Sequence, residues 1–137
     1  MLANPSLDEI RQLLREARRI AVVGCSPKTY RPSHEIAEFL IDRGYEVVPV
    51  NPGHSSLLDR PCYPNVSAIP ERVDLVDVFR RSELVAPVVD DAIAAHARAI
   101  WLQDSIRNDA AAARARAAGL IVIQDRCIMR DHLTLIA

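Results

Sequence analysis

The sequence predicts an α/β domain with three layers, in which helices cover both faces of a mainly parallel sheet of five strands or slightly more. Short apolar runs that end in glycine, proline or asparagine alternate along the chain with segments of helical periodicity, as expected of a doubly wound parallel sheet. Half of the 137 residues are hydrophobic and 26% are charged, so the chain has enough apolar side chains for one folded core. We therefore expect a single domain over residues 1–137.

The first half of the chain is expected to contain two helices and two long strands. Ser6 is suited to cap a helix whose apolar residues recur at helical spacing. The run RRIAVVG predicts the first strand, which ends at Gly24. Ser33 is expected to cap a second helix that ends at Gly44. The run YEVVPV, stopped by an Asn-Pro-Gly turn, predicts the second strand.

A proline-rich connection over residues 54–72 opens the second half and is expected to hold a short strand near residues 60–63. The apolar run VDLVDVF, at 73–79, predicts a central parallel strand. Ser82 is expected to cap the next helix, which runs to about His96, and AIWLQ predicts a further strand.

The last part of the chain repeats the same alternation. Asn108 is suited to cap an alanine-rich helix that Gly119 ends, LIVIQ predicts the last long strand, and CIMRDHLTLI predicts a closing helix. With the strands in the order 3-2-1-4-5, the first strand and the strand at 73–79 flank the point where the order reverses.

Positive charges precede two of the predicted helices. Lys28 and Arg31 lie just before the second helix, and Arg80 and Arg81 lie just before the third. A cation at a helix N-terminus is unfavourable by a few tenths to about 1 kcal/mol, and a bound anion would reverse that sign. Either loop alone is explained more simply by solvated surface arginines. Both together, at the reversal of strand order, favour a phosphate site.

Common phosphate-binding patterns do not fit this site. A dinucleotide turn needs three glycines and an acidic residue after the second strand, whereas this turn has only Gly24 and the strand ends in Val-Asn-Pro. A Walker motif is also missing from the sequence. The pattern indicates a phosphorylated nucleotide gripped by side chains. Because only 4% of residues are aromatic, we expect aliphatic side chains and prolines to hold an adenine ring.

Four segments closely resemble the small stand-alone CoA-binding domain proteins, which are related to the N-terminal CoA-binding domain of the succinyl-CoA synthetase α subunit. The resemblance runs from about residue 12 to 134, in the same order. It implies a Rossmann-like fold that binds coenzyme A and usually has no known reaction of its own. The segments are VVGCSPKTYRPSHEIAEFLIDRGYEVVPVNP, CYPNVSAIPERVDLVDVFRRSE, AIWLQDSI and AAGLIVIQDRCIMRDH.

The resemblance also implies where the ligand binds. The loop after the first strand would hold the phosphates, the end of the second strand would border the adenosine, and the loop after 73–79 would form the other wall. Ser105 stands where the family usually has glycine, so a positive φ there would be strained. The residues expected at the site are Gly24, Cys25, Ser26, Lys28, Arg31, Ser33, Val50, Asn51, Pro52, Phe79, Arg80, Arg81, Trp101 and Gln103.

Several of these residues also have simple structural interpretations. Asn51 is suited to start a turn before a proline, and Phe79 and Trp101 belong to residue types that more often pack in a core or wall than stack on a base. Cys25 is either a small buried residue or, at a helix mouth beside a lysine, a thiol with a lowered pKa. Outside the site, Asp77 in the strand at 73–79 is expected to face solvent or to cap a loop.

The expected function is that of a binding module for coenzyme A or an acyl-CoA, without catalytic residues and without a metal. One alternative is the CoA-binding component of an acyl-CoA ligase or transferase that needs a partner chain, and another is a redox regulator that uses Cys25. The formal net charge of −1 does not favour nucleic-acid binding, and no signal peptide or membrane span is expected. We expect a cytoplasmic protein, with a weak homodimer or an unknown protein partner left open.

Overall fold

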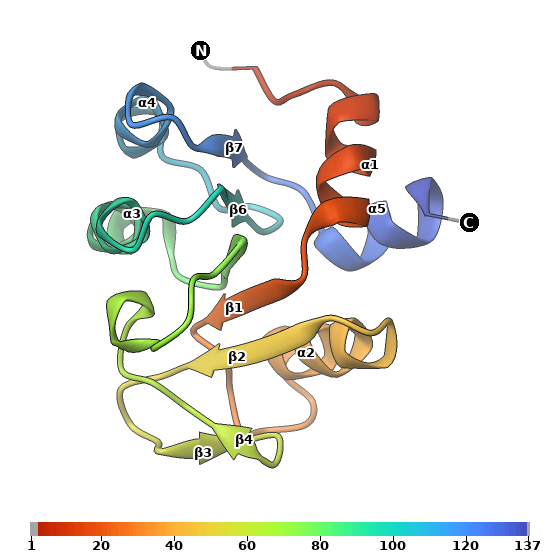
Figure 1. The fold of residues 1–137 in the computed structure, drawn as a ribbon, viewed down its shortest axis with the longest axis vertical. Helices are drawn as coiled ribbons and strands as arrows, with labels where there is room; N and C mark the ends of the chain where they lie inside the picture. Colours follow the sequence, from red (N-terminus) through yellow and green to blue (C-terminus); the bar gives the residue numbers. More distant parts are fainter. Residues whose placement is uncertain (1–2, 137) are drawn as a thin grey trace.

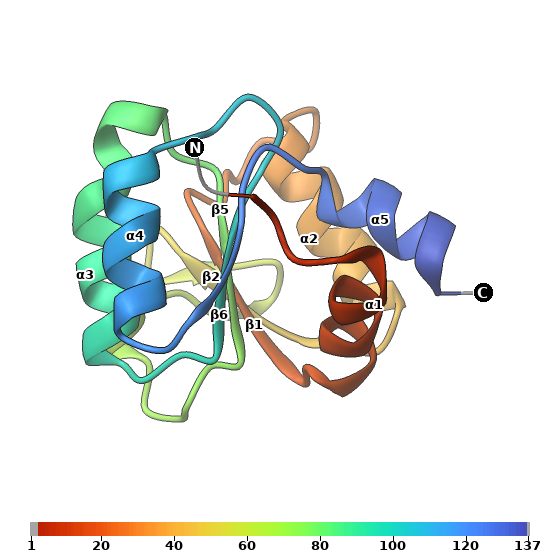
Figure 2. The same ribbon diagram turned by 90° about the horizontal axis from the view of Figure 1, so that it is seen from above.

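Five parallel strands form the centre of the computed structural model, which describes residues 3–136 (Figure 1). The order across the sheet is β2 (Glu46–Val50), β1 (Arg19–Val23), β5 (Leu75–Val78), β6 (Ala99–Leu102) and β7 (Ile121–Ile123). Figure 2 shows the helices on the two faces of this sheet. One face carries α1 (Leu7–Glu16), α2 (Pro32–Asp42) and α5 (Ile128–Leu135), and the other carries α3 (Val85–Ala94) and α4 (Asp109–Ala117). The predicted three-layer, Rossmann-like α/β fold is confirmed.

The strand order reverses beside β1, as predicted. β1 pairs with β2 on one side and with β5 on the other, so that Ile20 lies between Val47 and Leu75. The chain first builds outward to β2 and then crosses back to place β5, β6 and β7 on the other side of β1. The carboxyl ends of β1 and β5 therefore meet at one edge of the sheet, where doubly wound folds bind ligands.

The predicted short strand near residues 60–63 does not join the main sheet as a strand. Instead, β3 (Ser56–Leu57) and β4 (Arg60–Pro61) form a small antiparallel hairpin. Only Tyr63 pairs with the main sheet, through an isolated parallel bridge to Val50. Pro61 and Pro64 flank this residue, and because proline has no N–H to donate, the bridge cannot extend into a longer ladder.

Four helix boundaries follow the prediction. Ser6 caps α1, and its side chain and that of Glu9 form a reciprocal capping box. The Asn108 side chain caps α4 by accepting a hydrogen bond from the Ala111 N–H. Gly44 and Gly119 lie just beyond the ends of α2 and α4 with φ of +94° and +93°, the left-handed geometry that favours glycine at this position.

The start of α2 differs from the prediction. Arg31 is the N-cap and Pro32 occupies the first helical position, where its fixed φ is favourable and its missing N–H costs nothing. Ser33 therefore lies inside the first turn instead of capping it. Its hydroxyl oxygen accepts a hydrogen bond from the Ser26 N–H (3.0 Å), which fixes the loop before the helix.

The start of α3 also differs. Ser82 begins a short 3-10 helix, Ser82–Leu84, and the α-helix starts only at Val85. The Ser82 hydroxyl oxygen accepts a hydrogen bond from the backbone N–H of Arg107 (3.0 Å) and so joins the loop after β6 to this turn. The prediction that Ser82 caps a helix was wrong because this side chain bonds across the fold.

Two apolar clusters fill the space between the sheet and its helices, one on each face. Ile20, Leu75 and Trp101 are completely buried under α1, α2 and α5, whereas Val76 and Ile100 point toward α3 and α4. Alternating residues of each strand thus serve both cores, which explains why these strands are apolar throughout. Within residues 3–136 the helices are too short or too polar to cross a membrane.

Ser105, which follows β6, has φ of +68°. Replacing Ser105 with glycine should raise the free energy of unfolding by roughly 1 kcal/mol, because it relieves left-handed strain that exceeds the entropy cost of glycine. Urea unfolding would measure this gain. Ser56→Gly in the exposed strand β3 provides the control and should destabilise the protein, since extended backbone gains nothing from glycine.

Candidate functional site

The loops after β1 and β5 touch at Gly24 and Phe79. Gly24 has φ of +83°, and a Cβ atom built on it would lie 2.6 Å from the Phe79 carbonyl oxygen. The Phe79 N–H donates to the Val23 carbonyl (2.9 Å), and the Gly24 N–H donates to the Val50 carbonyl (3.0 Å). Only glycine allows this approach, which draws the ends of three strands together at the edge of the sheet.

The loop from Gly24 to the start of α2 lines a cavity of about 380 Å³. Ser26 shapes the loop, because its hydroxyl oxygen accepts a hydrogen bond from the Lys28 N–H (3.1 Å). Neither Lys28 nor Arg31 has a carboxylate partner within residues 3–136; the Arg31 guanidinium lies over the exposed Tyr30 ring (5.7 Å). Arg31 caps α2 without a side-chain hydrogen bond, and in the first turn only the Ser33 N–H has no partner among the described residues, because Pro32 has no N–H and those of His34 and Glu35 donate to the Arg31 carbonyl (3.1 Å each). The walls are Gly24, Ser26, Lys28, Arg31, Pro32, Ser33 and Phe79.

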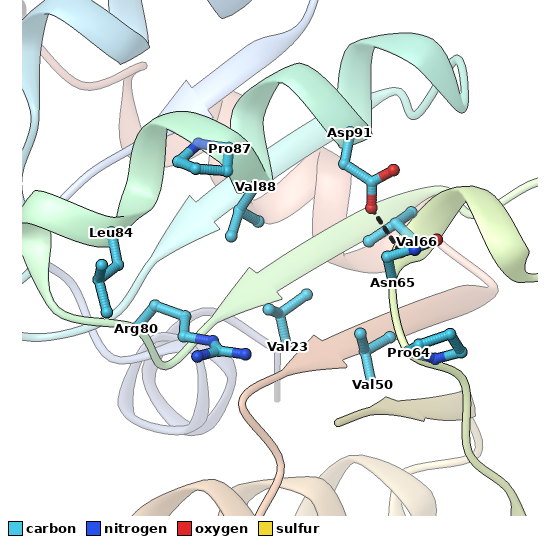
Figure 3. A pocket seen from close by; sticks show the side chains of 10 residues that line it. All are labelled: Val23, Val50, Pro64, Asn65, Val66, Arg80, Leu84, Pro87, Val88 and Asp91. Carbon is cyan, nitrogen blue, oxygen red and sulfur yellow. Dashed lines mark hydrogen bonds between the residues drawn. The ribbon is translucent and has the colours of Figure 1, made fainter. Parts of the chain in front are cut away.

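A second cavity, of about 440 Å³, opens between the ends of β1 and β2 and helix α3 (Figure 3). Arg80 lines it and has no ion pair in the described part of the chain. The Asp91 carboxylate accepts hydrogen bonds from the backbone N–H groups of Val66 (2.5 Å) and Ser67, and these bonds fasten the loop before β5 to α3. The walls are Val23, Val50, Pro64, Asn65, Val66, Arg80, Leu84, Pro87, Val88 and Asp91.

A third cavity, of about 390 Å³, lies between α2 and α5 and has mainly apolar walls. Gln103 lines it although only 4% of this residue is exposed, and its Oε1 accepts a hydrogen bond from the Ile128 N–H (3.2 Å). Pro32 and Phe79 line both this cavity and the one after β1, so the two cavities are adjacent. The walls are Pro32, Glu35, Ile36, Phe79, Gln103, Asp104, Ile106, Cys127 and Met129.

Nine of the fourteen predicted site residues line these cavities, and the other five do not. The Asn51 side chain bonds to backbone groups of two loops. Its amide nitrogen donates to the Cys25 carbonyl (2.9 Å), and its oxygen accepts from the Gly53 N–H (2.8 Å). Pro52 is exposed outside the three walls. The Arg81 side chain is 77% exposed and pairs with Glu83 (3.4 Å), pointing to a surface role.

Trp101 and Cys25 are both fully buried. The Trp101 indole N–H donates to the Arg126 carbonyl (2.8 Å), so this ring packs in the core and does not line the site where it was expected. Burial, with smaller contributions from Cys62 and Asp77, raises the pKa of the Cys25 thiol to about 12. Of the two interpretations of Cys25, the small buried residue is confirmed and the lowered pKa is wrong, so the redox alternative loses its basis.

Asp77 was expected to face solvent or to cap a loop, and this expectation was wrong. The residue is fully buried in β5 between Val22 and Trp101, and neither carboxylate oxygen has a hydrogen-bond partner within the described residues. Desolvation raises the pKa of Asp77 well above its usual range. Asp74 does cap a loop, because it accepts hydrogen bonds from the N–H groups of Arg18 (2.8 Å) and Arg19 (2.9 Å).

Sequence reasoning missed most of the wall formed by α3 and the loop around Asn65. Pro64, Asn65 and Val66 lie in one of the segments that carry the family resemblance but were not assigned to the site, and the wall residues of α3 lie outside those segments. The signal that could have located part of the wall is the pairing of the proline-rich connection with the second strand, since Tyr63 bridges Val50 and carries the next residues to this edge.

Comparisons with known proteins give the family. A family model described as a CoA binding domain matches residues 18–132. The uncharacterized protein YneT of Bacillus subtilis (strain 168) is 36% identical over 131 residues, which cover 96% of this chain and 97% of YneT. A solved structure of a hypothetical protein from Pyrococcus horikoshii OT3 has a TM-score of 0.95 and 36% identity, with 100% of this chain and 99% of that chain covered.

A longer relative shares only part of the chain. The ADP-forming acetate–CoA ligase I of Archaeoglobus fulgidus is 36% identical over 72 residues, which are 53% of this chain but 10% of the ligase. The similarity therefore covers a small piece of that enzyme. Because the family model matches most of the present sequence, the chain belongs to the CoA binding domain family.

Proposed function

We propose that the protein binds coenzyme A or an acyl-CoA along the carboxyl edge of the sheet and performs no reaction by itself. The observation that carries this proposal is the placement of Lys28, Arg31 and Arg80, which have no carboxylate partner in residues 3–136. Lys28 and Arg31 line the cavity after β1, and Arg80 lines the cavity beside α3. Coenzyme A has the matching order of parts: a nucleoside, a highly charged phosphate region and a long thiol arm. The family to which the chain belongs supports the same ligand.

Each part of the ligand has a suitable cavity. The cavity lined by Val23, Val50 and Pro87 offers the aliphatic and proline walls expected for adenosine. The cavity lined by Lys28 and Arg31 supplies two cations and the Ser33 N–H at the start of α2 for the pyrophosphate. The apolar cavity beside Phe79 then receives the pantetheine arm or an acyl group. Arg80, in the adenosine cavity, is placed to bind the 3′-phosphate.

Isothermal titration calorimetry with CoA, dephospho-CoA, NAD and ATP tests the ligand. We expect CoA to bind most tightly, because only this ligand fills all three cavities and carries the 3′-phosphate. Dephospho-CoA should bind more weakly. NAD binding without CoA binding would overturn the proposal.

Replacing Arg80 with glutamine should weaken CoA binding about tenfold or more, since a charge-assisted hydrogen bond is lost, and the loss should shrink as salt rises. The same substitution should matter less for dephospho-CoA if Arg80 binds the 3′-phosphate. Arg81→Gln is the matched control, because this neighbouring arginine lies outside the cavity walls and is paired with Glu83. Equal losses for both variants would contradict the assignment.

A second candidate function is that of a component of an ADP-forming acyl-CoA ligase. The similarity of about half of the chain to acetate–CoA ligase I favours it. In that case a partner chain supplies the remaining chemistry, and the same crevice holds CoA. Co-purification of a partner, followed by an assay for ATP-dependent CoA thioester formation, would support this function, and activity without the present chain would contradict it.

A further inference from the structure

A separate cavity of about 530 Å³ lies at the opposite end of the sheet from the proposed CoA crevice. It opens where α1 and α2 end and where β1 and β2 begin, against α5 (Figure 1). The length of β1, about 15 Å, separates it from the crevice. Its walls are Leu14, Arg15, Ala17, Arg18, Arg43, Gly44, Tyr45, His132 and Ile136.

The walls of this cavity carry positive charge without compensation. Arg15, Arg18 and Arg43 line it, and no aspartate or glutamate does. Within residues 3–136 their guanidinium groups have no carboxylate or carbonyl partner; that of Arg43 lies over the Phe39 ring (4.4 Å). Most other arginines are held by protein oxygens: Arg11, Arg19, Arg60, Arg72, Arg81, Arg98, Arg107, Arg114, Arg116, Arg126 and Arg130.

The cationic side chains without a carboxylate or carbonyl partner in residues 3–136 therefore form two groups, and each group lines a cavity. Lys28, Arg31 and Arg80 belong to the proposed CoA crevice, and the other group is the arginine set of this cavity. In the crevice, the lack of protein partners is explained by an anionic ligand. The same reasoning applies at the opposite end, where no family property assigns a ligand.

His132 is a buried polar side chain in the wall of this cavity. Only 6% of this residue is exposed, and its Nδ1 has no hydrogen-bond partner among the described residues. The rings of Phe39 and Tyr45 meet it edge-on at 5.5 and 5.8 Å. Burial and the charge of Arg43 lower the pKa of His132. Because the ring belongs to the wall, its NMR signals should respond to a ligand in the cavity.

Helix dipoles are a simpler explanation for arginines at this end, because cations are favourable near helix C-termini. However, backbone and tyrosine donors already satisfy nearby helix carbonyls. The Ala17 N–H bonds to the Leu13 carbonyl, the Gly44 N–H bonds to the Ile41 carbonyl, and the Tyr45 hydroxyl donates to the Leu14 carbonyl (2.5 Å). Dipole compensation therefore accounts for part of the charge, but not for the hollow beside it or for the unpartnered imidazole.

We propose that this cavity binds a small organic oxyanion, a carboxylate or phosphate group attached to an apolar body. The arginines suit this group because the planar guanidinium matches both carboxylate and phosphate oxygens. Leu14, Tyr45 and Ile136 provide apolar contacts for the remainder of the molecule. This site is independent of the proposed CoA crevice.

NMR of the His132 ring tests the proposal, with phenyl phosphate, benzoate and uncharged benzyl alcohol as probes. The titrations use the protein saturated with CoA, at an ionic strength held constant with sodium chloride. We expect a saturable shift of the His132 signals with one or both anions and none with benzyl alcohol. The two anions separate phosphate from carboxylate recognition. No shift with either anion, or an equal shift with benzyl alcohol, would overturn the proposal.

Substitutions of single arginines and of Lys28 test whether the anion binds in this cavity. Arg43→Gln should weaken anion binding about tenfold, whereas Arg114→Gln, on α4 across the sheet, should leave it unchanged. Lys28→Gln removes a cation from the crevice and should also leave this binding intact, so failure of the CoA proposal would not be mistaken for failure here. Equal weakening by all three variants would indicate nonspecific attraction and contradict the site.

Discussion

Replacing Gly24 with alanine should lower the free energy of unfolding by about 3 kcal/mol and weaken CoA binding about tenfold or more. Two costs combine: alanine is strained at φ of +83°, and its Cβ would lie 2.6 Å from the Phe79 carbonyl oxygen. That oxygen belongs to backbone fixed by the bond from the Phe79 N–H to Val23, so it cannot swing away as a flexible side chain would. The loops after β1 and β5 must separate, and the crevice widens.

Gly44→Ala is a matched control for this experiment. Gly44 has a similar φ of +94°, but a Cβ on it would meet nothing within 4 Å. It should cost only about 1 kcal/mol, from backbone strain alone, and leave CoA binding unchanged. Chemical denaturation and calorimetry on both variants separate strain from close approach. Equal effects of the two substitutions would show that the contact with Phe79 does not shape the site.

Replacing Asp77 with asparagine should make the protein progressively more stable than the wild type as pH rises from about 4. The folded-state pKa of Asp77 is raised because its carboxyl group is buried without a partner. The folded state therefore holds a proton that the unfolded chain releases above its ordinary pKa. Asp77 therefore contributes its full stabilisation to the wild type below the pKa that it has in the unfolded chain. Above that pKa the free energy of unfolding falls by about 1.4 kcal/mol per pH unit, until the pH reaches the pKa of Asp77 in the folded protein. Asparagine, which does not titrate, removes this loss.

Urea unfolding of both proteins from pH 3 to pH 9 measures the effect, since other titrations cancel in the difference. The difference in stability between variant and wild type should be constant below about pH 4, widen above it, and stop widening once the folded-state pKa of Asp77 is passed. Asp90→Asn, on the exposed side of α3, is the control and should show no such widening. A constant gap for Asp77→Asn would mean that the buried carboxyl group finds a partner on folding.

Much of the fold could be predicted because periodicity and turn residues act locally. The alternation of apolar runs with helical segments predicted a parallel sheet, and the reversal of strand order between the first strand and the strand at 73–79 is confirmed, whereas the short strand near residues 60–63 is not part of that sheet. The wrong cap at Ser33 came from weighing a serine above the preceding Pro32, although proline favours the first helical position. The signal was present in the sequence and was not used.

The site was harder to predict because the burial of a side chain and its hydrogen-bond partners depend on residues that are distant in the sequence. Trp101 and Gln103 point to the same side of β6, but Trp101 is two residues further from the edge and lies wholly in the core. Arg80 and Arg81 are adjacent and chemically identical, and only the first turns into a cavity. The burial of Asp77 followed from the predicted architecture, since helices were expected on both faces of the sheet and this strand was expected at its centre; the interpretation failed because the charge of the residue was weighed above its position.

The central position of β1 also affects how the chain folds as it is made. β1 ends at Val23, but its second neighbour in the sheet begins only at Leu75. At usual elongation rates, about 3 to 10 seconds of translation separate the two segments. Throughout that delay one side of an apolar strand has no partner and can pair with another nascent chain. Crowded polysomes are thus the setting in which this molecule is most prone to aggregate.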